Sequence, residues 1–80
     1  MAEVILYMKD NCQLCDEVRD LLMIFQDEYN FEIIERDIYT RDEWLEAYHL
    51  NLPVVEINRQ QIDYRSIDIV SLEDFLQKNF

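Results

Sequence analysis

The pair Cys12-Gln13-Leu14-Cys15 stands where a short apolar segment gives way to a segment with helical periodicity. Residues 4–8 (VILYM) are continuously apolar, which is typical of a strand buried on both faces of a sheet. The following residues 13–28 carry a one-sided apolar stripe at helical spacing, formed by Leu14, Val18, Leu21, Leu22 and Phe25 and continued by Tyr29. Cysteines three residues apart at a helix start are close enough for a disulfide, which needs Cα atoms roughly 5.5 Å apart. This position predicts a redox site, although a Cys-x-x-Cys pair alone also serves zinc sites.

The segments after this helix continue a strand–helix–strand pattern. Asn30 is a good left-handed cap for the helix end, and residues 31–38 have the pattern of a second strand. A strand, a helix and a strand at this spacing predict parallel pairing with a right-handed crossover. Thr40 and Glu43 fit the capping-box pattern, which predicts a short second helix opening at Thr40. The inward side of that helix would carry Trp44, Leu45 and Tyr48.

The rest of the chain predicts a hairpin followed by a third helix. Residues 53–57 form the expected third strand, with a proline at the first position, where proline is tolerated. Asn58 and Arg59 form a two-residue turn into an antiparallel fourth strand at residues 60–64. Ser71 is the expected N-cap of the third helix. The buried face of this helix would consist of Leu72, Phe75, Leu76 and Phe80.

The order βαβαββα predicts one α/β domain over residues 1–80, with a four-stranded mixed sheet flanked by helices. Eighty residues are enough for one modest core. The chain has no glycine, which excludes a glycine-rich phosphate loop or a dinucleotide-binding fingerprint. Its net charge of -11 disfavours binding to nucleic acid or to an anionic membrane surface. Solubility is the simplest explanation of this acidity, and selection of a partner with a basic face is the alternative.

The beginning of the chain predicts a protein that carries no secretory signal. Met1-Ala2-Glu3 offers no basic n-region, and no apolar run approaches the ~20 residues needed to span a membrane. We therefore expect a cytoplasmic protein without a membrane partner. Structural disulfides are rare in that compartment, so the paired cysteines predict a catalytic or metal-binding role.

The chain resembles the thioredoxin superfamily, and within it the glutaredoxin-like proteins, in three stretches: residues 6–17 (LYMKDNCQLCDE), 37–38 (DI) and 52–55 (LPVV). The form Cys-x-Leu-Cys-Asp-Glu is similar to a small subgroup of glutaredoxin-like domains rather than to dithiol glutaredoxins, which usually carry Cys-Pro-Tyr-Cys. The resemblance extends over essentially the whole chain. It implies a thioredoxin-like fold and a protein that transfers electrons between thiols and disulfides.

Cys12 is the candidate catalytic nucleophile, and Cys15 is the candidate resolving thiol. The thiolate is the reactive form, and a helix N-terminus favours it through its partial positive charge. Lys9 occupies the place of a lysine typical of glutaredoxins and would add a full positive charge. Acidic residues at positions 10, 16 and 17 oppose this effect, so we expect only a modestly lowered pKa for Cys12. The alternatives are an ordinary exposed thiol at Cys12 and a small buried apolar side chain at Cys15.

The resemblance also implies residues that bind the substrate. Pro53 is expected to be cis and to face Cys12, and the backbone of Leu52 would pair with a bound peptide or tripeptide like an added strand. Arg41 would hold the glycine carboxylate of glutathione, although surface arginines are usually just solvated. Residues 64–68 lack the paired glycine that precedes the last helix of glutaredoxins. Glutathione as co-substrate and a reductase as the alternative electron donor therefore both stay open.

The residues together predict a thiol–disulfide oxidoreductase that reduces protein disulfides or glutathione-mixed disulfides through Cys12 and Cys15. We expect it to act as a monomer on a disulfide-containing client, with no bound cofactor and no metal. One alternative is a metal or iron–sulfur module, although this pair supplies only two of the four ligands that a structural zinc site needs. The other alternative is an interaction domain that keeps the fold and has lost the chemistry.

Overall fold

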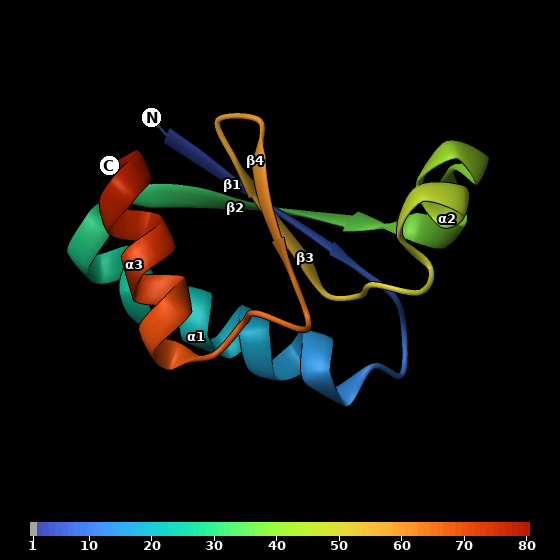
Figure 1. Cartoon of the computed structure of the whole chain (residues 1–80), viewed down its shortest axis with the longest axis horizontal. Coiled ribbons are helices and arrows are strands. Elements are labelled where there is room, and N and C mark those ends of the chain that lie inside the picture. The colour runs from blue at the N-terminus through green and yellow to red at the C-terminus, as the bar shows by residue number, and fades with distance from the viewer. Residues whose placement is uncertain (1) are drawn as a thin grey trace.

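A computed structural model describes residues 2–80, and its elements follow the expected order βαβαββα (Figure 1). The elements are β1 (Ala2–Met8), α1 (Gln13–Tyr29), β2 (Phe31–Asp37), the 3-10 turn η1 (Ile38–Thr40), α2 (Asp42–Tyr48), β3 (Val54–Ile57), β4 (Gln60–Asp63) and α3 (Ile69–Asn79). The four strands form one sheet in the order β2-β1-β3-β4. β1 and β2 pair in parallel, whereas the β1–β3 and β3–β4 pairs are antiparallel. The sheet is therefore mixed, as the sequence predicts.

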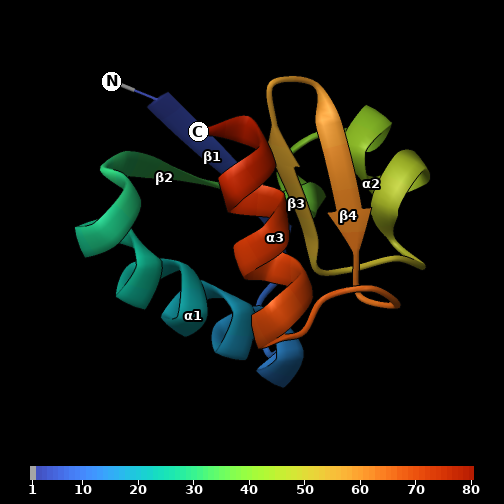
Figure 2. The same cartoon turned by 60° about the vertical axis from the view of Figure 1, so that its left-hand side comes forward.

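Helices cover both faces of the sheet. Successive strand residues point to opposite sides, so each face carries buried side chains that pack against helices. α1 and α3 pack on the face that carries Val4 and Leu6 of β1 and Val55 of β3 (Figure 2). α2 packs at the other face, against Tyr7 of β1 and Val54 of β3. The first cluster is larger and contains most of the fully buried side chains. Among residues 2–80, no helix is long and apolar enough to cross a lipid bilayer.

The first helix confirms the expected stripe except at its start. Val18, Leu22 and Phe25 are buried, and Asn30 ends the helix in the left-handed conformation with φ 61°. Leu14, which the stripe was expected to include, is 46% exposed. The buried position in the first turn belongs to Cys15, because residues 15, 18, 22 and 25 continue one inward row and Leu14 lies on its flank.

The expected capping box at the second helix is wrong. Thr40 belongs to the 3-10 turn, where its hydroxyl donates to the carbonyl of Asp37 at 2.6 Å. The Asp37 carboxylate accepts the backbone N–H of Tyr39 at 2.9 Å and so caps this turn. α2 therefore begins one residue later, with Arg41 as an N-cap that makes no side-chain capping bond.

The third helix begins three residues earlier than predicted. Asp68 is the N-cap, its carboxylate accepts the N–H of Ser71 at 2.8 Å, and the Ser71 hydroxyl accepts the N–H of Asp68 at 2.9 Å. Ser71 is thus the third helical residue of a reciprocal capping box rather than the cap itself. The expected buried face at Leu72, Phe75 and Leu76 is confirmed. Phe80 is 42% exposed and stacks on Phe31, with ring centroids 5.7 Å apart.

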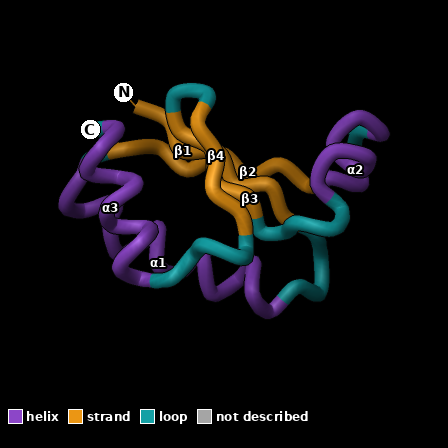
Figure 3. Tube along the Cα trace, in the orientation of Figure 1, coloured by secondary structure: helices purple, strands orange, loops and turns teal. Residues whose placement is uncertain are grey.

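The hairpin turn is as predicted, and the strand ends differ by one or two residues. Asn58 and Arg59 both have positive φ, 52° and 69°, as a tight two-residue turn requires. Figure 3 shows the loop that joins β3 to β4. β3 begins after Pro53, which has no N–H for the sheet, and β2 ends before Ile38 enters the 3-10 turn. β1 begins two residues earlier than expected and β4 ends one residue earlier.

Candidate functional site

The two cysteines lie at the junction between β1 and α1. Asn11 adopts a left-handed conformation with φ 55°, which turns the chain from the strand into the helix. Cys12 is the N-cap of α1, and its sulfur accepts the backbone N–H of Cys15 at 3.2 Å. The first helical N–H groups have no partner within the helix, so a sulfur at the N-cap lies where a negative charge is stabilised.

Cys12 and Cys15 form a disulfide in this structure, with their Cα atoms 5.2 Å apart. The residues differ in exposure: Cys12 is half-buried, whereas Cys15 is only 1% exposed and lies in the inward row of α1. An incoming molecule can therefore reach Cys12 more readily than Cys15. This asymmetry is what a nucleophile and a resolving thiol require.

The charges near the pair are partly compensated. The Asp16 carboxylate pairs with Arg19 at 3.0 Å, and Arg19 also reaches Glu35 of β2 at 3.1 Å. The carboxylate of Asp16, which was expected to oppose thiolate formation at Cys12, thus has a cation of its own. Lys9 follows β1 in the sequence and precedes the two cysteines. Its side chain is half-buried, and the ion pairs found among residues 2–80 do not include it.

The segment before β3 lies at the same end of the sheet as the cysteines. Tyr7 pairs with Val54 in the antiparallel β1–β3 ladder, so the end of β1 lies beside the beginning of β3. The Leu52–Pro53 peptide bond is cis, as the resemblance implies. Pro53 is buried and Leu52 is half-buried. The role of these two residues in binding a substrate stays a prediction.

Arg41 already has partners within the chain. As expected, it stands at the start of α2. Its guanidinium pairs with Glu43 at 3.2 Å and lies over the ring of Trp44, 5.1 Å from the centroid. Both side chains of the ion pair are well exposed, so the guanidinium can exchange these contacts for a ligand at little cost.

The cluster between α2 and the sheet contains an arginine that the sequence pattern does not single out. Arg36 donates to the Tyr7 hydroxyl at 3.0 Å and lies 5.3 Å from the ring centroid of Trp44. Burial raises the pKa of Tyr7, and the hydrogen bond from Arg36 partly offsets this effect. The parallel register of β1 and β2 places Tyr7 beside Arg36, and no local sequence pattern specifies that register. This cluster anchors α2 at the end of the sheet where the cysteines lie.

The described residues 2–80 contain no group of three or more His, Cys, Asp or Glu side chains placed to hold a metal ion. Two sulfur atoms at Cys12 and Cys15 are half the ligand set of a tetrahedral zinc site. Any metal bound there would need ligands from another molecule.

A Cys-x-x-Cys pair at the start of the first helix, on a mixed sheet of order β2-β1-β3-β4, defines a thioredoxin-like protein. The model of the glutaredoxin-like domain family (DUF836) matches residues 3–77, and the chain belongs to this family. The structure is similar to the X-ray structure of the Northeast Structural Genomics target protein XcR50 from X. campestris, with a TM-score of 0.79 and 24% identity over 94% of this chain and 96% of that one. It is also similar to the structure of a malarial protein, with a TM-score of 0.69 and 15% identity over 100% of this chain and 98% of that one.

Proposed function

We propose that the chain is a thiol–disulfide oxidoreductase that reduces disulfides of client proteins, or mixed disulfides with glutathione, through Cys12 and Cys15. The observation that carries the proposal is the asymmetry of the pair. The more accessible sulfur is the N-cap of α1 and accepts a backbone N–H, while its partner is buried within disulfide distance. Membership of the glutaredoxin-like family supports the same chemistry.

The reaction proceeds by two thiol–disulfide exchanges. The Cys12 thiolate attacks one sulfur of the client disulfide, forms a mixed disulfide and expels the other client sulfur as a thiolate. The Cys15 thiolate then attacks the Cys12 sulfur, closes the Cys12–Cys15 disulfide and releases the second client thiolate. Two electrons pass from the dithiol to the client, which takes up two protons. Two molecules of glutathione, or the dithiol of a reductase, restore the reduced pair.

The other predicted residues have supporting roles in this proposal. Lys9 stabilises the Cys12 thiolate electrostatically, and the Leu52 backbone beside Pro53 pairs with the extended client. Arg41 binds a carboxylate of the substrate. The protein acts as a cytoplasmic monomer, without a resident metal or cofactor and without nucleic acid or membrane as a partner.

Replacing Cys15 with serine should trap the mixed disulfide, because the second exchange then lacks its attacking thiol. The reduced Cys15→Ser variant, mixed with one equivalent of a disulfide-linked peptide, should accumulate a covalent adduct of protein plus half the peptide disulfide. Intact mass spectrometry measures the adduct, and peptide mapping should place it on Cys12. Wild type under the same conditions should instead end as the internal disulfide with little adduct. No adduct on Cys15→Ser, with the thiol at Cys12 still free, would refute the proposed function.

A further inference from the structure

One side of α1 carries a row of polar side chains that begins at the accessible cysteine. Cys12, Asp16 and Arg19 are spaced by four and then three residues, so they lie on the same side of the helix. Glu17, the next acidic residue, lies about 100° further around the helix than Asp16. Of these two carboxylates, that of Asp16 therefore shares the side of Cys12.

Asp16 is one helical turn from Cys12. Its backbone N–H donates to the carbonyl of Cys12 at 3.1 Å. Side chains in this relation have Cβ atoms about 5–6 Å apart, and a helical side chain points back over the preceding turn, which here contains Cys12. The unpaired N–H groups at the start of α1 also attract a carboxylate. A free carboxylate at position 16 would therefore turn toward the sulfur and oppose its negative charge.

Arg19 holds the Asp16 carboxylate from the other direction, one turn further along α1. Its Nη2 donates to Asp16 Oδ1 at 3.0 Å, and its Nη1 donates to Glu35 Oε1 of β2 at 3.1 Å. With one arm on each carboxylate, the guanidinium is tied to both the helix and the sheet. The hydrogen bond to Glu35 and the charge of Asp16 raise the pKa of Arg19. The guanidinium therefore stays charged wherever a thiol titrates.

The other charged groups at this end of the sheet either cap another element or precede α1. Asp37 of β2 caps the 3-10 turn, and Asp68 caps α3. The turn between β1 and α1 contains Lys9 and Asp10. Residues 50–55, which lead into β3, include no titratable side chain. These groups stay the same in the variants described below, so a change in the ionisation of the nucleophile reports on the row along α1.

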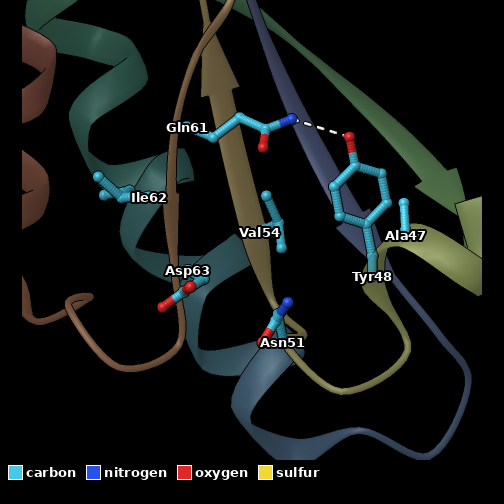
Figure 4. Close-up of a pocket in the computed structure, with 7 residues that line it drawn as sticks. All are labelled: Ala47, Tyr48, Asn51, Val54, Gln61, Ile62 and Asp63. Carbon is cyan, nitrogen blue, oxygen red and sulfur yellow. Dashed lines mark hydrogen bonds between the residues drawn. The ribbon is translucent and has the colours of Figure 1, made fainter.

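The cavity of about 210 Å³ between α2, β3 and β4 is separate from this row (Figure 4). Its wall is formed by side chains from residues 47–63, whereas the row belongs to α1 and β2. Asp63 is the charged residue of the wall, and its carboxylate pairs with Arg65 at 2.8 Å. The charge of the cavity is thus compensated within its own part of the chain, and the row can be tested independently of it.

We propose that Arg19 is a positioning residue that favours the thiolate of Cys12 by holding and compensating the Asp16 carboxylate. Glu35 anchors the guanidinium to the sheet, so its other arm stays on Asp16. The start of α1 then offers its partial positive charge to the sulfur instead of to the carboxylate. This inference rests on the proposed function, because it explains how the nucleophile of that reaction ionises.

The test measures the pH at which the Cys12 thiol is half-ionised in the reduced protein. The rate of Cys12 alkylation is followed against pH by peptide mapping, and the midpoint is the readout because it does not depend on the intrinsic reactivity of the thiolate. Arg19→Gln frees the Asp16 carboxylate, which disfavours the thiolate. The midpoint should therefore rise by about 0.4 pH units, as expected for like charges one helical turn apart.

A second background separates an action through Asp16 from the charge of the guanidinium itself. The Cα atom of Arg19 is about 10 Å further along the helix axis than that of Cys12, which is about one Debye length at 0.1 M salt. In the Asp16→Asn background, Arg19→Gln should therefore raise the midpoint by no more than about 0.1 pH units. An equal rise in both backgrounds would overturn the positioning role.

Two controls exclude a general change of charge or of structure. Arg59→Gln removes the same charge from the exposed turn between β3 and β4 and should leave the midpoint unchanged. The rise in Arg19→Gln should also shrink in ~1 M NaCl, where the Debye length is about 3 Å. A rise that is equally large in this salt, or that also occurs in Arg59→Gln, would contradict the electrostatic role of Arg19.

Reduction of a disulfide-linked peptide by the same proteins distinguishes failure of this inference from failure of the proposed function. If Arg19→Gln raises the midpoint as expected but wild type does not reduce the peptide, the role of Arg19 stands and the proposed function fails. If wild type reduces the peptide and Arg19→Gln leaves the midpoint unchanged, the inference is overturned and the proposed function stands.

Discussion

Replacing Cys12 with serine should abolish disulfide reduction, with a loss of at least ~10³-fold in turnover. The serine hydroxyl stays protonated at neutral pH and cannot attack a disulfide, whereas a cysteine at a helix N-terminus supplies a thiolate. Cys12 is also the more accessible of the two sulfurs, so Cys15 at 1% exposure cannot readily take over the first step.

The measurement is reduction of a disulfide-linked peptide by the pre-reduced protein, with and without glutathione as donor. Cys15→Ser is the matched control, because it makes the same cysteine-to-serine change three residues further along the chain. This variant should retain the first exchange. Circular dichroism should show that both variants keep the fold. Turnover by Cys12→Ser within a few-fold of wild type would refute the assignment of the nucleophile and favour an interaction domain.

The largest effect on stability is expected for Leu22→Ala in α1. Leu22 is fully buried between α1 and the sheet, and truncating such a side chain leaves a cavity that costs about 2–5 kcal/mol. A chain of 80 residues has roughly 4–12 kcal/mol in total, so this loss removes a large fraction of its stability. Urea denaturation of the reduced protein should therefore show a strongly lowered midpoint.

The control lies two residues further along the same helix. Ile24 is 68% exposed, and Ile24→Ala should change the free energy of unfolding by less than ~0.5 kcal/mol. If the two substitutions cost the same, the inward row of α1 is misassigned. A marked fall of the denaturant slope in Leu22→Ala would instead point to a change in the denatured state rather than to loss of core packing.

The fold was largely predictable because several local signals agree with one another. Each signal predicts the conformation of its own segment, and each appears in the structure. The signals are the apolar β1, the inward row of α1, the left-handed Asn30 and the Asn58-Arg59 turn. Together they define the order of elements. The order in turn restricts the pairing, since two strands joined by a helix pair in parallel and a two-residue turn makes a hairpin.

The helix starts were harder to predict because neighbouring residues compete for the same role. Thr40 and Ser71 are both good N-caps by residue type. In the structure, Asp37 caps the 3-10 turn that contains Thr40. Asp68 is the N-cap of α3, because its carboxylate accepts the N–H of Ser71. Which of two suitable side chains becomes the cap depends on where the preceding strand or loop ends, and the local pattern does not encode that position.

The candidate site also has parts that single segments predict and parts that they do not. The sequence predicts the cysteine pair, and the resemblance implies the cis bond before Pro53. Both are predictable because each lies within a few consecutive residues. The Arg36–Tyr7–Trp44 cluster is assembled from elements far apart in the chain. Such contacts depend on strand register and on how α2 docks, so single segments carry little signal for them.

The most direct test of a redox role for Cys12 is the pH dependence of its alkylation, resolved from Cys15 by peptide mapping of the reduced, chelator-treated protein. A free thiol titrates near ~8.5. A nucleophile at the N-cap of α1 should react with a midpoint clearly below that value, while Cys15 stays nearly unreactive. An unshifted midpoint with both thiols reacting alike would contradict the redox assignment and leave a thioredoxin-like fold without its chemistry.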